Sequence, residues 1–368
     1  MQEKRSKRVK DPEKLPRYCL VLLGVAGLAL LLYIIAAISN GFADWFHATV
    51  GAGVRALLAH LTTWLPLSLS EILLLLSPLL IGLVSVHGFR HRCQTWKSSF
   101  VYIGCILSVA SIFFSLFVFT LGCGYHTTPL EERLGLEVGT VSEEELYQTA
   151  LLLAKEVNLA ADGVTFGENG FSEMPYDLKQ MNAHLLDGYA DLCEEYAFVS
   201  SLSSRVKPVL ASRLMSYTHI TGVYSYFTGE ANLNVDFPDY TLPFTAAHEL
   251  AHQRGIAREN EANFVAFLAA ERSDDPYIRY SAYLNLFEYV AGTLQRSDPG
   301  LAGEVISSLR GEVRGELRAY SEFFDAYRDS AAADLSGAVN DTYLKLNGNK
   351  AGAASYGLVV GLAVAYFR

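Results

Sequence analysis

One stretch of the chain, HELAHQRGIARENEAN from His248 to Asn263, holds residues whose types and spacing suit metal chemistry. His248 and His252 are four residues apart, so on a helix both imidazoles lie on one face. Two histidines in this arrangement bind Zn²⁺, and Glu249, next to the first histidine, can accept a proton from a water on the metal. The pattern therefore predicts a zinc site with Glu249 as the general base.

A third ligand should come from the segment that follows, because a catalytic zinc site has three protein ligands and one open position. Gly255 is expected to end the helix, since glycine readily adopts the left-handed conformation at a helix C-terminus. A second helix that starts near Arg258 would then turn a carboxylate back towards the histidines. Glu259 and Glu261 are both candidates; the sequence favours Glu259 and leaves Glu261 as the alternative.

These residues make the chain resemble the gluzincin group of zinc metallopeptidases. The second motif of that group is a glutamate with alanine or serine three residues on and aspartate or asparagine four on. In this register Glu259 matches the ligand glutamate, and Asn263 matches the residue that holds a ligand histidine by its second ring nitrogen. The six residues between His252 and Glu259 are fewer than is usual in gluzincins. The metzincin pattern fails, because its third ligand would fall on Arg258, which cannot bind zinc.

The resemblance implies a zincin-like α+β domain, mainly helical with a small β-sheet, in which an edge strand binds extended peptide beside the motif helix. Residues 209–236 suit such a sheet, because they are rich in β-branched and aromatic residues and are broken by glycines. Six further residues are candidates for lining the cleft or stabilising an oxyanion, with ordinary packing as the alternative for each: Glu230, Asn232, Tyr217, His219, Tyr280 and Tyr283.

The first third of the chain is unusually apolar. Hydrophobic residues make up 51% of the whole sequence, and the excess gathers in long runs that can cross a hydrocarbon core of about 30 Å. The middle run contains Glu71 near its start and Pro78, which is expected to kink the helix. We therefore expect a membrane domain over residues 18–122 with three transmembrane helices, at about 18–38, 67–86 and 100–122.

Basic residues indicate the orientation of these helices in the bilayer. Residues 1–17 contain seven lysines and arginines, and the connection between the second and third runs contains three more. Positive residues stay in the cytoplasm, so residues 123–368 are expected on the outer side of the cell membrane as one metallopeptidase domain. Residues 42–66 predict either an amphipathic helix in the outer interface or a partly ordered hairpin.

The charge of the chain is unevenly distributed. The total is −10; residues 1–17 carry +4 and residues 18–125 carry +2, which leaves −16 for residues 126–368. An acidic outer domain argues against nucleic acid as a partner. Cys123 and Cys193 both fall on the predicted outer side, where a disulfide is permitted, but the sequence leaves their pairing open.

Other local patterns predict the remaining elements of the outer domain. Ser142 and Glu145 form a capping-box pattern at the start of a helix that runs to about Val157. Residues 162–172 are rich in glycine and polar residues and predict a loop. Apolar spacing predicts further helices over residues 176–202, 261–271, 276–294, 304–328 and, as a buried terminal helix, 356–367.

The sequence thus predicts a membrane-anchored zinc metallopeptidase that hydrolyses peptide bonds in extracytoplasmic or envelope proteins, with the lipid bilayer and a peptide or protein substrate as partners. The alternative is an envelope sensor or scaffold that contains zinc and binds peptide without cutting it. Glu249 argues against this alternative, because a purely structural site does not need that carboxylate. The overall layout also resembles an uncharacterised bacterial membrane-protein family of unknown function, which indicates architecture but no substrate.

Overall fold

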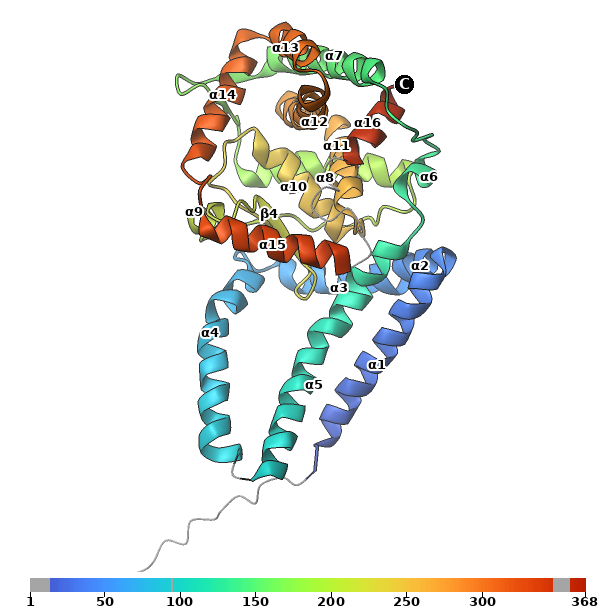
Figure 1. Ribbon diagram of the computed structural model, residues 1–368, viewed down its shortest axis with the longest axis vertical. Coiled ribbons are helices and arrows are strands. Elements are labelled where there is room, and N and C mark those ends of the chain that lie inside the picture. The colour runs from blue at the N-terminus through green and yellow to red at the C-terminus, as the bar shows by residue number, and fades with distance from the viewer. Residues whose placement is uncertain (1–13, 94, 347–357) are drawn as a thin grey trace, which may run out of the picture.

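Three long helices end at one side of a larger helical body in the computed structural model of the chain (Figure 1). The structure describes residues 14–93, 95–346 and 358–368. Most of the basic N-terminal segment that set the predicted orientation lies outside the described residues. The described chain is mainly α-helical with two small β-sheets. We call the described residues from 122 onwards the globular domain.

The long helices are the three predicted apolar runs. They are α1 (Arg17–Ile38), α4 (Leu69–His87, continued by the π-helical turn η2, Gly88–Arg92) and α5 (Trp96–Thr120). Each is long and apolar enough to cross a membrane. Large aliphatic side chains along all three helices are exposed, an arrangement that favours a lipid environment over water. The predicted membrane-spanning helices are confirmed as helices of the required length and composition.

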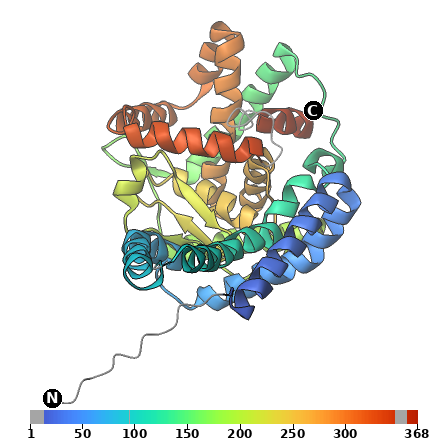
Figure 2. The ribbon, with the colours of Figure 1, turned by 60° about the horizontal axis from the view of Figure 1, so that its bottom comes forward.

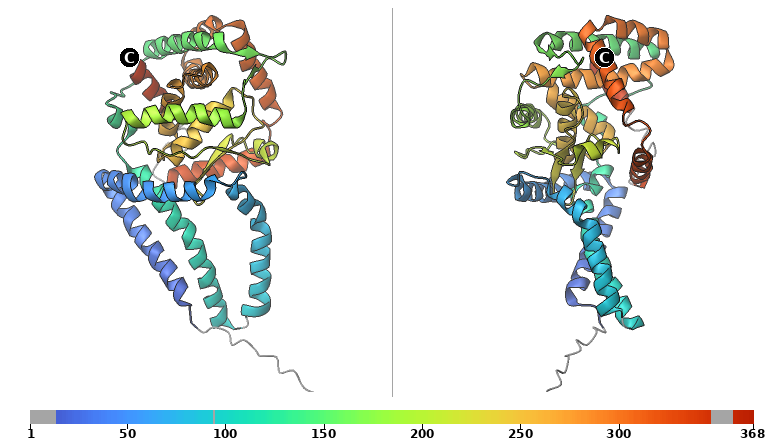
Figure 3. Two further views of the ribbon diagram at one scale, coloured as in Figure 1. Left: turned by 180° about the vertical axis from the view of Figure 1, so that it is seen from behind. Right: turned by 90° about the vertical axis from the view of Figure 1, so that its left-hand side faces the viewer.

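The connection between α1 and α4 is helical and lies across the ends of the long helices, beneath the globular domain (Figure 3). It consists of α2 (Asn40–Phe46), the π-helical turn η1 (His47–Gly51) and α3 (Ala52–Thr63). One side of this connection is apolar and exposed, and it includes Trp45, Leu57, Leu61 and Trp64. The helical alternative for residues 42–66 therefore holds over the hairpin.

Helices build most of the globular domain, with short 3₁₀ turns at Gly122–His126 (η3) and Ala161–Gly163 (η4). The motif helix α10 (Thr241–Gln253) lies at the centre of the core, packed against α11 (Glu259–Glu271) and α12 (Pro276–Ser297). The other helices surround this centre: α6 (Leu130–Leu134), α7 (Glu143–Ala160), α8 (Leu178–Glu195), α9 (Ser212–Ser216), α13 (Pro299–Ser308), α14 (Gly311–Asp325), α15 (Ala331–Leu346) and α16 (Val359–Phe367).

A three-stranded sheet covers α10 on the side nearest the long helices (Figure 2). Its order is β3 (Lys207–Pro208), β5 (Glu230–Leu233), β4 (Gly222–Ser225), with β3 parallel and β4 antiparallel to β5. Strand β4 is therefore an edge strand. A second, two-stranded sheet pairs β1 (Thr165–Phe166) with β2 (Ser172–Glu173) and overlaps residues 162–172, which the sequence predicted as a loop.

Several element boundaries differ from the predictions. The helix expected over 176–202 ends at Glu195, and the helix expected over 304–328 is two helices, because the backbone is extended at Leu309 between α13 and α14. α15 was not predicted. The capping box of Ser142 with Glu145 is confirmed, and α16 is a buried helix, although residues 356–357 lie outside the described residues. Cys123 and Cys193 are both free thiols.

Candidate metal centre

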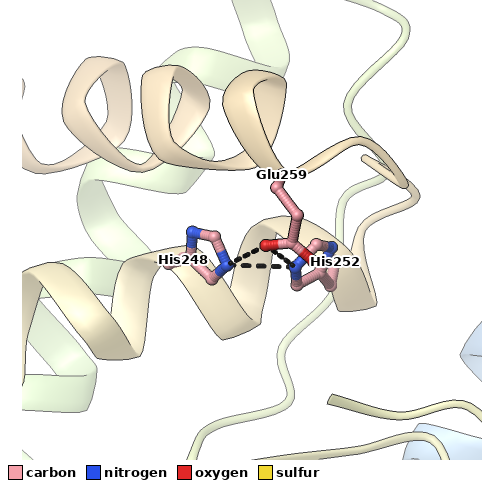
Figure 4. Close-up of side chains that lie close together, drawn as sticks. All are labelled: His248, His252 and Glu259. Atoms are coloured by element: carbon pink, nitrogen blue, oxygen red, sulfur yellow. Dashed lines mark hydrogen bonds and ion pairs between the residues drawn. The ribbon is translucent and has the colours of Figure 1, made fainter. Parts of the chain in front are cut away.

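The two motif histidines project from one face of α10, one helical turn apart (Figure 4). Their Nε2 atoms are 3.0 Å apart. Almost every residue of α10 is buried between α11, α12 and β5. Because the surrounding core fixes the rotation of the helix about its axis, it also fixes the direction in which His248 and His252 point.

A tight reversal after α10 returns the chain to these histidines. Gly255 has φ +104°, in the left-handed region that glycine favours. The N–H of Gly255 donates to the carbonyl of His252, and the N–H of Ile256 donates to the carbonyl of Ala251, both at 3.0 Å. These two bonds form a Schellman motif. The predicted helix end at Gly255 is confirmed, and the reversal places the first residue of α11 opposite the histidines.

Glu259 is that first residue. Its Oε2 lies 3.3 Å from Nε2 of His248 and 3.6 Å from Nε2 of His252, and the three side chains form a group whose donor atoms could hold one metal ion. Tetrahedral zinc with bonds of about 2.0–2.1 Å separates its ligand atoms by roughly 3.4 Å. The three observed separations, from 3.0 to 3.6 Å, lie around this value, so the spacing of the three ligand atoms suits one zinc ion.

The charges of the three residues are strongly coupled. Burial alone lowers the pKa of His252, but the nearby Glu259 carboxylate overcomes this effect and raises it to about 9. Burial raises the pKa of Glu259, and the two histidines then bring it well below its ordinary range. In the absence of metal, the cluster therefore pairs a protonated imidazole with a carboxylate. A divalent cation can replace that proton, because the ligand atoms already face one another.

Glu249 points to the edge strand β4. Its side chain is 5% exposed, and a Cβ on Gly222 of β4 would lie 2.7 Å from both its Cγ and its Oε1. The nearby backbone N–H of Tyr224 favours the charged form of this carboxylate. Burial is the largest cause of a raised pKa for Glu249, and Glu259 adds to it, while the two histidines oppose it. A carboxylate with a raised pKa is a better proton acceptor near neutral pH.

The second ring nitrogen of each histidine has a different environment. Nδ1 of His252 lies 2.7 Å from the carbonyl oxygen of Ile256, in the reversal after α10. Nδ1 of His248 is buried and has no hydrogen-bond partner among the described residues, and the same holds for Nδ2 of Asn263. Asn263 interacts with the phenol of Tyr289. The sequence analysis assigned Asn263 the role of holding the second ring nitrogen of a ligand histidine. For His252, the backbone carbonyl of Ile256 takes this role.

Glu261, the alternative third ligand, points away from the histidines. Its Oε1 accepts hydrogen bonds from the backbone N–H of Leu130 at 3.1 Å and from Arg258 at 2.5 Å. Arg258 in turn donates to the carbonyl oxygens of Tyr125 and Thr127. Glu261 therefore connects α11 to the segment after α5, and the geometry favours Glu259 over Glu261 as the ligand.

Glu230 and Asn232 lie in a separate buried cluster. Both oxygens of Glu230 accept hydrogen bonds from the first residues of α4, Leu69 N and Ser70 N, at 3.0 and 2.9 Å, and Nζ of Lys207 lies 2.6 Å from Oε1. Asn232 donates to Ser70 Oγ and to the carbonyl of Val223. The prediction that these two residues line a cleft is wrong, because buried strand residues facing α4 are used for packing.

Glu71 completes this cluster from the first turn of α4. Its carboxylate accepts hydrogen bonds from Leu210 N and Ala211 N, at 2.9 and 2.8 Å. We call Glu71, Lys207, Glu230 and Asn232 the docking network, because together they fix the end of α4 to the three-stranded sheet. The acidic residue inside a predicted membrane helix is thus explained by its contact with the globular domain.

The helical connection between α1 and α4 contacts the reversal next to the metal centre. We call its elements α2, η1 and α3 the crosswise helices. Nε2 of His47 lies 2.6 Å from the carbonyl oxygen of Gly255. Arg55 is 1% exposed and donates to the carbonyl oxygens of His47 and Thr120. A Cβ on Gly255 would lie 2.5 Å from Nη2 of Arg55. The loop that supports His252 is therefore packed against elements that connect the long helices.

The four predicted oxyanion candidates have other contacts. Tyr217 packs edge-on against Tyr327, and Nε2 of His219 lies 2.7 Å from the carbonyl oxygen of Tyr327. The hydroxyl of Tyr280 donates to Glu316, and Tyr283 packs against Phe267. None of the four belongs to the group of ligand atoms formed by the described residues. They serve packing between helices in this structure.

Two tyrosines that the sequence did not single out lie near Glu259. Burial is the main cause of the raised pKa of both Tyr289 on α12 and Tyr343 on α15, and the charge of Glu259 contributes to both. The hydroxyl of Tyr343 also lies 3.2 Å from that of Tyr125. No local pattern marks these residues, because they reach the metal centre only through the packing of distant helices.

A family model described as "Protein of unknown function (DUF3810)" matches residues 47–364. The chain belongs to this family. The DUF3810 match begins in η1 and ends in α16, so it takes in the crosswise helix α3, the helices α4 and α5, and the whole metal centre. No curated protein and no solved structure matches the chain. Membership in the DUF3810 family therefore supports the shared architecture, and any function must be argued from the site.

Proposed function

We propose that the protein is a membrane-anchored zinc metallopeptidase of the gluzincin type, with a zincin-like globular domain that hydrolyses peptide bonds outside the cytoplasm. The observation that carries this proposal is the set of three separations between His248, His252 and Glu259, which suit one tetrahedral ion. The gluzincin resemblance of HELAH and of Glu259 with Asn263 supports the same conclusion independently.

His248, His252 and Glu259 would hold the zinc ion. Two imidazoles and one carboxylate are a known ligand set for catalytic zinc, which keeps a fourth position open. When bound, zinc supplies a Lewis acid that activates water and polarises a carbonyl group. Glu249 stays outside this ligand set, because its carboxylate lies against Gly222 and Tyr224 of β4.

Glu249 would move the proton in the reaction. Its carboxylate takes a proton from the attacking water and gives it to the leaving amine. Because burial raises the pKa of Glu249, the carboxylate is a stronger base than an exposed glutamate. The edge strand β4 beside it offers backbone groups to which an extended peptide can add as a further strand. Strand addition would place the peptide bond next to the base.

The proposed side of the membrane follows from the basic residues. Lysines and arginines before α1 and between α4 and α5 would stay in the cytoplasm. The globular domain follows α5, so it would lie on the opposite side, as expected for an enzyme of the bacterial envelope. Its contacts with the ends of α4 and α5, through the docking network and Arg55, hold the metal centre close to that membrane face.

The test compares the wild-type chain with Glu249→Gln and with Glu194→Gln, a matched control at an exposed glutamate on α8. All three are purified in detergent, analysed for zinc by plasma mass spectrometry, and incubated with a peptide library that includes both soluble segments and segments attached to a membrane-spanning helix. We expect about one zinc per chain in each variant, with turnover reduced at least about 100-fold only in Glu249→Gln. Bound zinc without turnover in the wild type would favour the sensor or scaffold alternative, and absence of zinc would contradict both.

A further inference from the structure

The connection between β4 and β5 is clamped by helices of the membrane domain. Tyr226 and Phe227 lie at its tip, where their rings pack edge-on against Phe117 and Phe113 of α5, with centroid distances of 5.5 and 5.4 Å. The hydroxyl of Thr120 also donates to the carbonyl of Tyr226. Figure 1 shows this hairpin, in yellow, reaching below the globular domain between α3 and α5.

α3 closes the clamp from the other side. The hydroxyl of Thr62 donates to the carbonyl of Thr228 at 3.4 Å. Gly229, with φ +72°, approaches α3 so closely that a Cβ would lie 2.6 Å from Cβ of Leu58. The hairpin tip therefore has a fixed position relative to α5, set by contacts on two sides.

The depth of this tip can be estimated from α5. The helix has 25 residues, or about 37 Å at 1.5 Å per residue, against a hydrocarbon core of about 30 Å. Phe113 lies about 10 Å from the end of α5 at Thr120. If the core is centred on α5, Phe113 lies roughly 7 Å inside its boundary. Phe227 packs on Phe113, so the tip of the hairpin reaches the bilayer interface, where aromatic residues are enriched.

Strand β4 runs from the metal centre to this tip. It begins at Gly222, against the Glu249 carboxylate, and ends at Ser225, directly before the tip. At about 3.3 Å per residue, an extended chain covers the distance from Gly222 to Phe227 in about five residues. β4 is an edge strand within the described sheet, and Val223 at its middle is 44% exposed.

We propose that the substrates are polypeptides anchored in the same membrane, and that the cut falls within about ten residues of their membrane-embedded segment. This inference rests on the proposed peptidase function and names its substrate class. A peptide that adds to β4 with its reacting bond beside Glu249 reaches the bilayer interface about five residues further along. An anchored chain that leaves the bilayer there can follow β4 directly from its membrane-embedded segment to Glu249.

The experiment measures where anchored chains are cut. The full protein, loaded with zinc, is reconstituted in phosphatidylethanolamine and phosphatidylglycerol nanodiscs with single-span reporters that carry a randomised 30-residue segment on the side of the globular domain. Mass spectrometry then maps the cut sites. All positions belong to the same anchored segment, so cuts near to and far from the span are compared within one reporter population. The same randomised segments without a span serve as the soluble control.

We expect cuts within ten residues of the span to outnumber those more than 20 residues away by at least about tenfold. An even distribution along the segment, or equal cutting of the soluble control, would overturn the inference and leave the peptidase function standing. No cutting of either library, with Glu249→Gln indistinguishable from wild type, would overturn the peptidase function and the inference together.

A second readout needs no turnover. A photo-crosslinking amino acid replaces the exposed Val223 of β4 in the Glu249→Gln variant, and a matched crosslinker replaces Val138, which is also exposed but lies in the globular domain before α7. Crosslinks from position 223 are expected in the ten residues of the reporter next to its span, at least about tenfold above those from position 138. Crosslinks from position 223 spread evenly along the segment would contradict the inference.

Discussion

The metal centre is a partly buried cluster and the docking network a buried one; both are built around glutamates, but their carboxylates differ in what surrounds them. In the docking network, Glu230 accepts two backbone N–H groups and the ammonium of Lys207. In the metal centre, the closest charged neighbours of Glu259 are His248 and His252, which are ligand candidates themselves. The Glu230 carboxylate already has protein hydrogen-bond and ion-pair partners for both oxygens. The Glu259 carboxylate faces two imidazoles, at a position where an ion can bind.

The comparison shows how to separate structural from functional carboxylates in a buried setting. A carboxylate that is satisfied by backbone donors and a lysine holds elements together, because its removal leaves buried donors without partners. A carboxylate surrounded by imidazoles is available to a metal. Glu259 and Glu261 show the same contrast two residues apart on α11, since Glu261 is occupied by Leu130 N and Arg258.

The largest effect on stability is expected in the docking network. Lys207→Met leaves the buried Glu230 without its cation, which should cost about 3–5 kcal/mol of unfolding free energy. The double variant with Glu230→Gln should recover part of this loss, because no unpaired charge remains. Urea unfolding in detergent, followed by tryptophan fluorescence, measures the change. If Lys207→Met left the unfolding free energy unchanged but lost zinc, the docking network would serve metal binding rather than stability, and the distinction between the two regions would be wrong.

The two glutamates of α11 allow the sharpest paired comparison. Glu259→Gln should weaken zinc binding by a factor of about 100 or more, since zinc sites with four ligands bind with about 10–16 kcal/mol and one ligand is lost. Glu261→Gln should leave zinc affinity unchanged and lower the unfolding free energy by about 1–3 kcal/mol, because it weakens the contacts to Leu130 and Arg258. Competition with a chromogenic chelator measures the affinity. Weaker binding in Glu261→Gln alone would reverse the assignment.

The reversal at Gly255 tests whether the crosswise helices support the metal centre. Gly255→Ala puts a Cβ where φ is +104° and where Arg55 and His47 leave no room. The loop must shift, and with it the Ile256 carbonyl that faces Nδ1 of His252. We expect zinc affinity to fall by about tenfold, as for other groups that support metal ligands. Gly139→Ala, at a site with open space, is the control and should bind zinc as the wild type does.

The smallest effect concerns pH and Glu288, a half-buried carboxylate on α12. Burial, with Glu316 nearby, raises the pKa of Glu288 to about 8 from an ordinary value of 4.5. Between these values the folded state holds a proton that the unfolded state lacks, so this group destabilises the fold as pH rises from about 5 to 8. Glu288→Gln should raise the thermal midpoint at pH 8.5 by a few degrees and change it little at pH 5. An equal shift at both pH values would contradict this assignment.

Local signals were sufficient to predict which three side chains meet at the candidate metal centre. The spacing of His248 and His252, the glycine at 255 and the helix that starts at Glu259 all depend on neighbouring residues, and the structure brings them together as expected. The apolar runs likewise predicted α1, α4 and α5. These features arise from periodicity and backbone preference, which a sequence displays directly.

The surroundings of the site could not be predicted in the same way. Glu230 and Asn232 were interpreted as cleft residues because they are polar and near strands, but their partners come from α4, more than 150 residues earlier in the chain. Tyr343 reaches the region of Glu259 from α15, a helix that the sequence analysis did not predict. Contacts between distant elements decide these roles, and a single sequence does not display such contacts.

Anomalous diffraction at the zinc edge, from crystals of the full chain grown with zinc, tests the central claim most directly. We predict one strong peak at about 2.0–2.2 Å from Nε2 of His248, Nε2 of His252 and a carboxylate oxygen of Glu259, with Glu249 outside the ligand set. A zinc-loaded crystal with no peak between these three side chains, or with the peak on Glu261, would contradict the assignment of the metal centre.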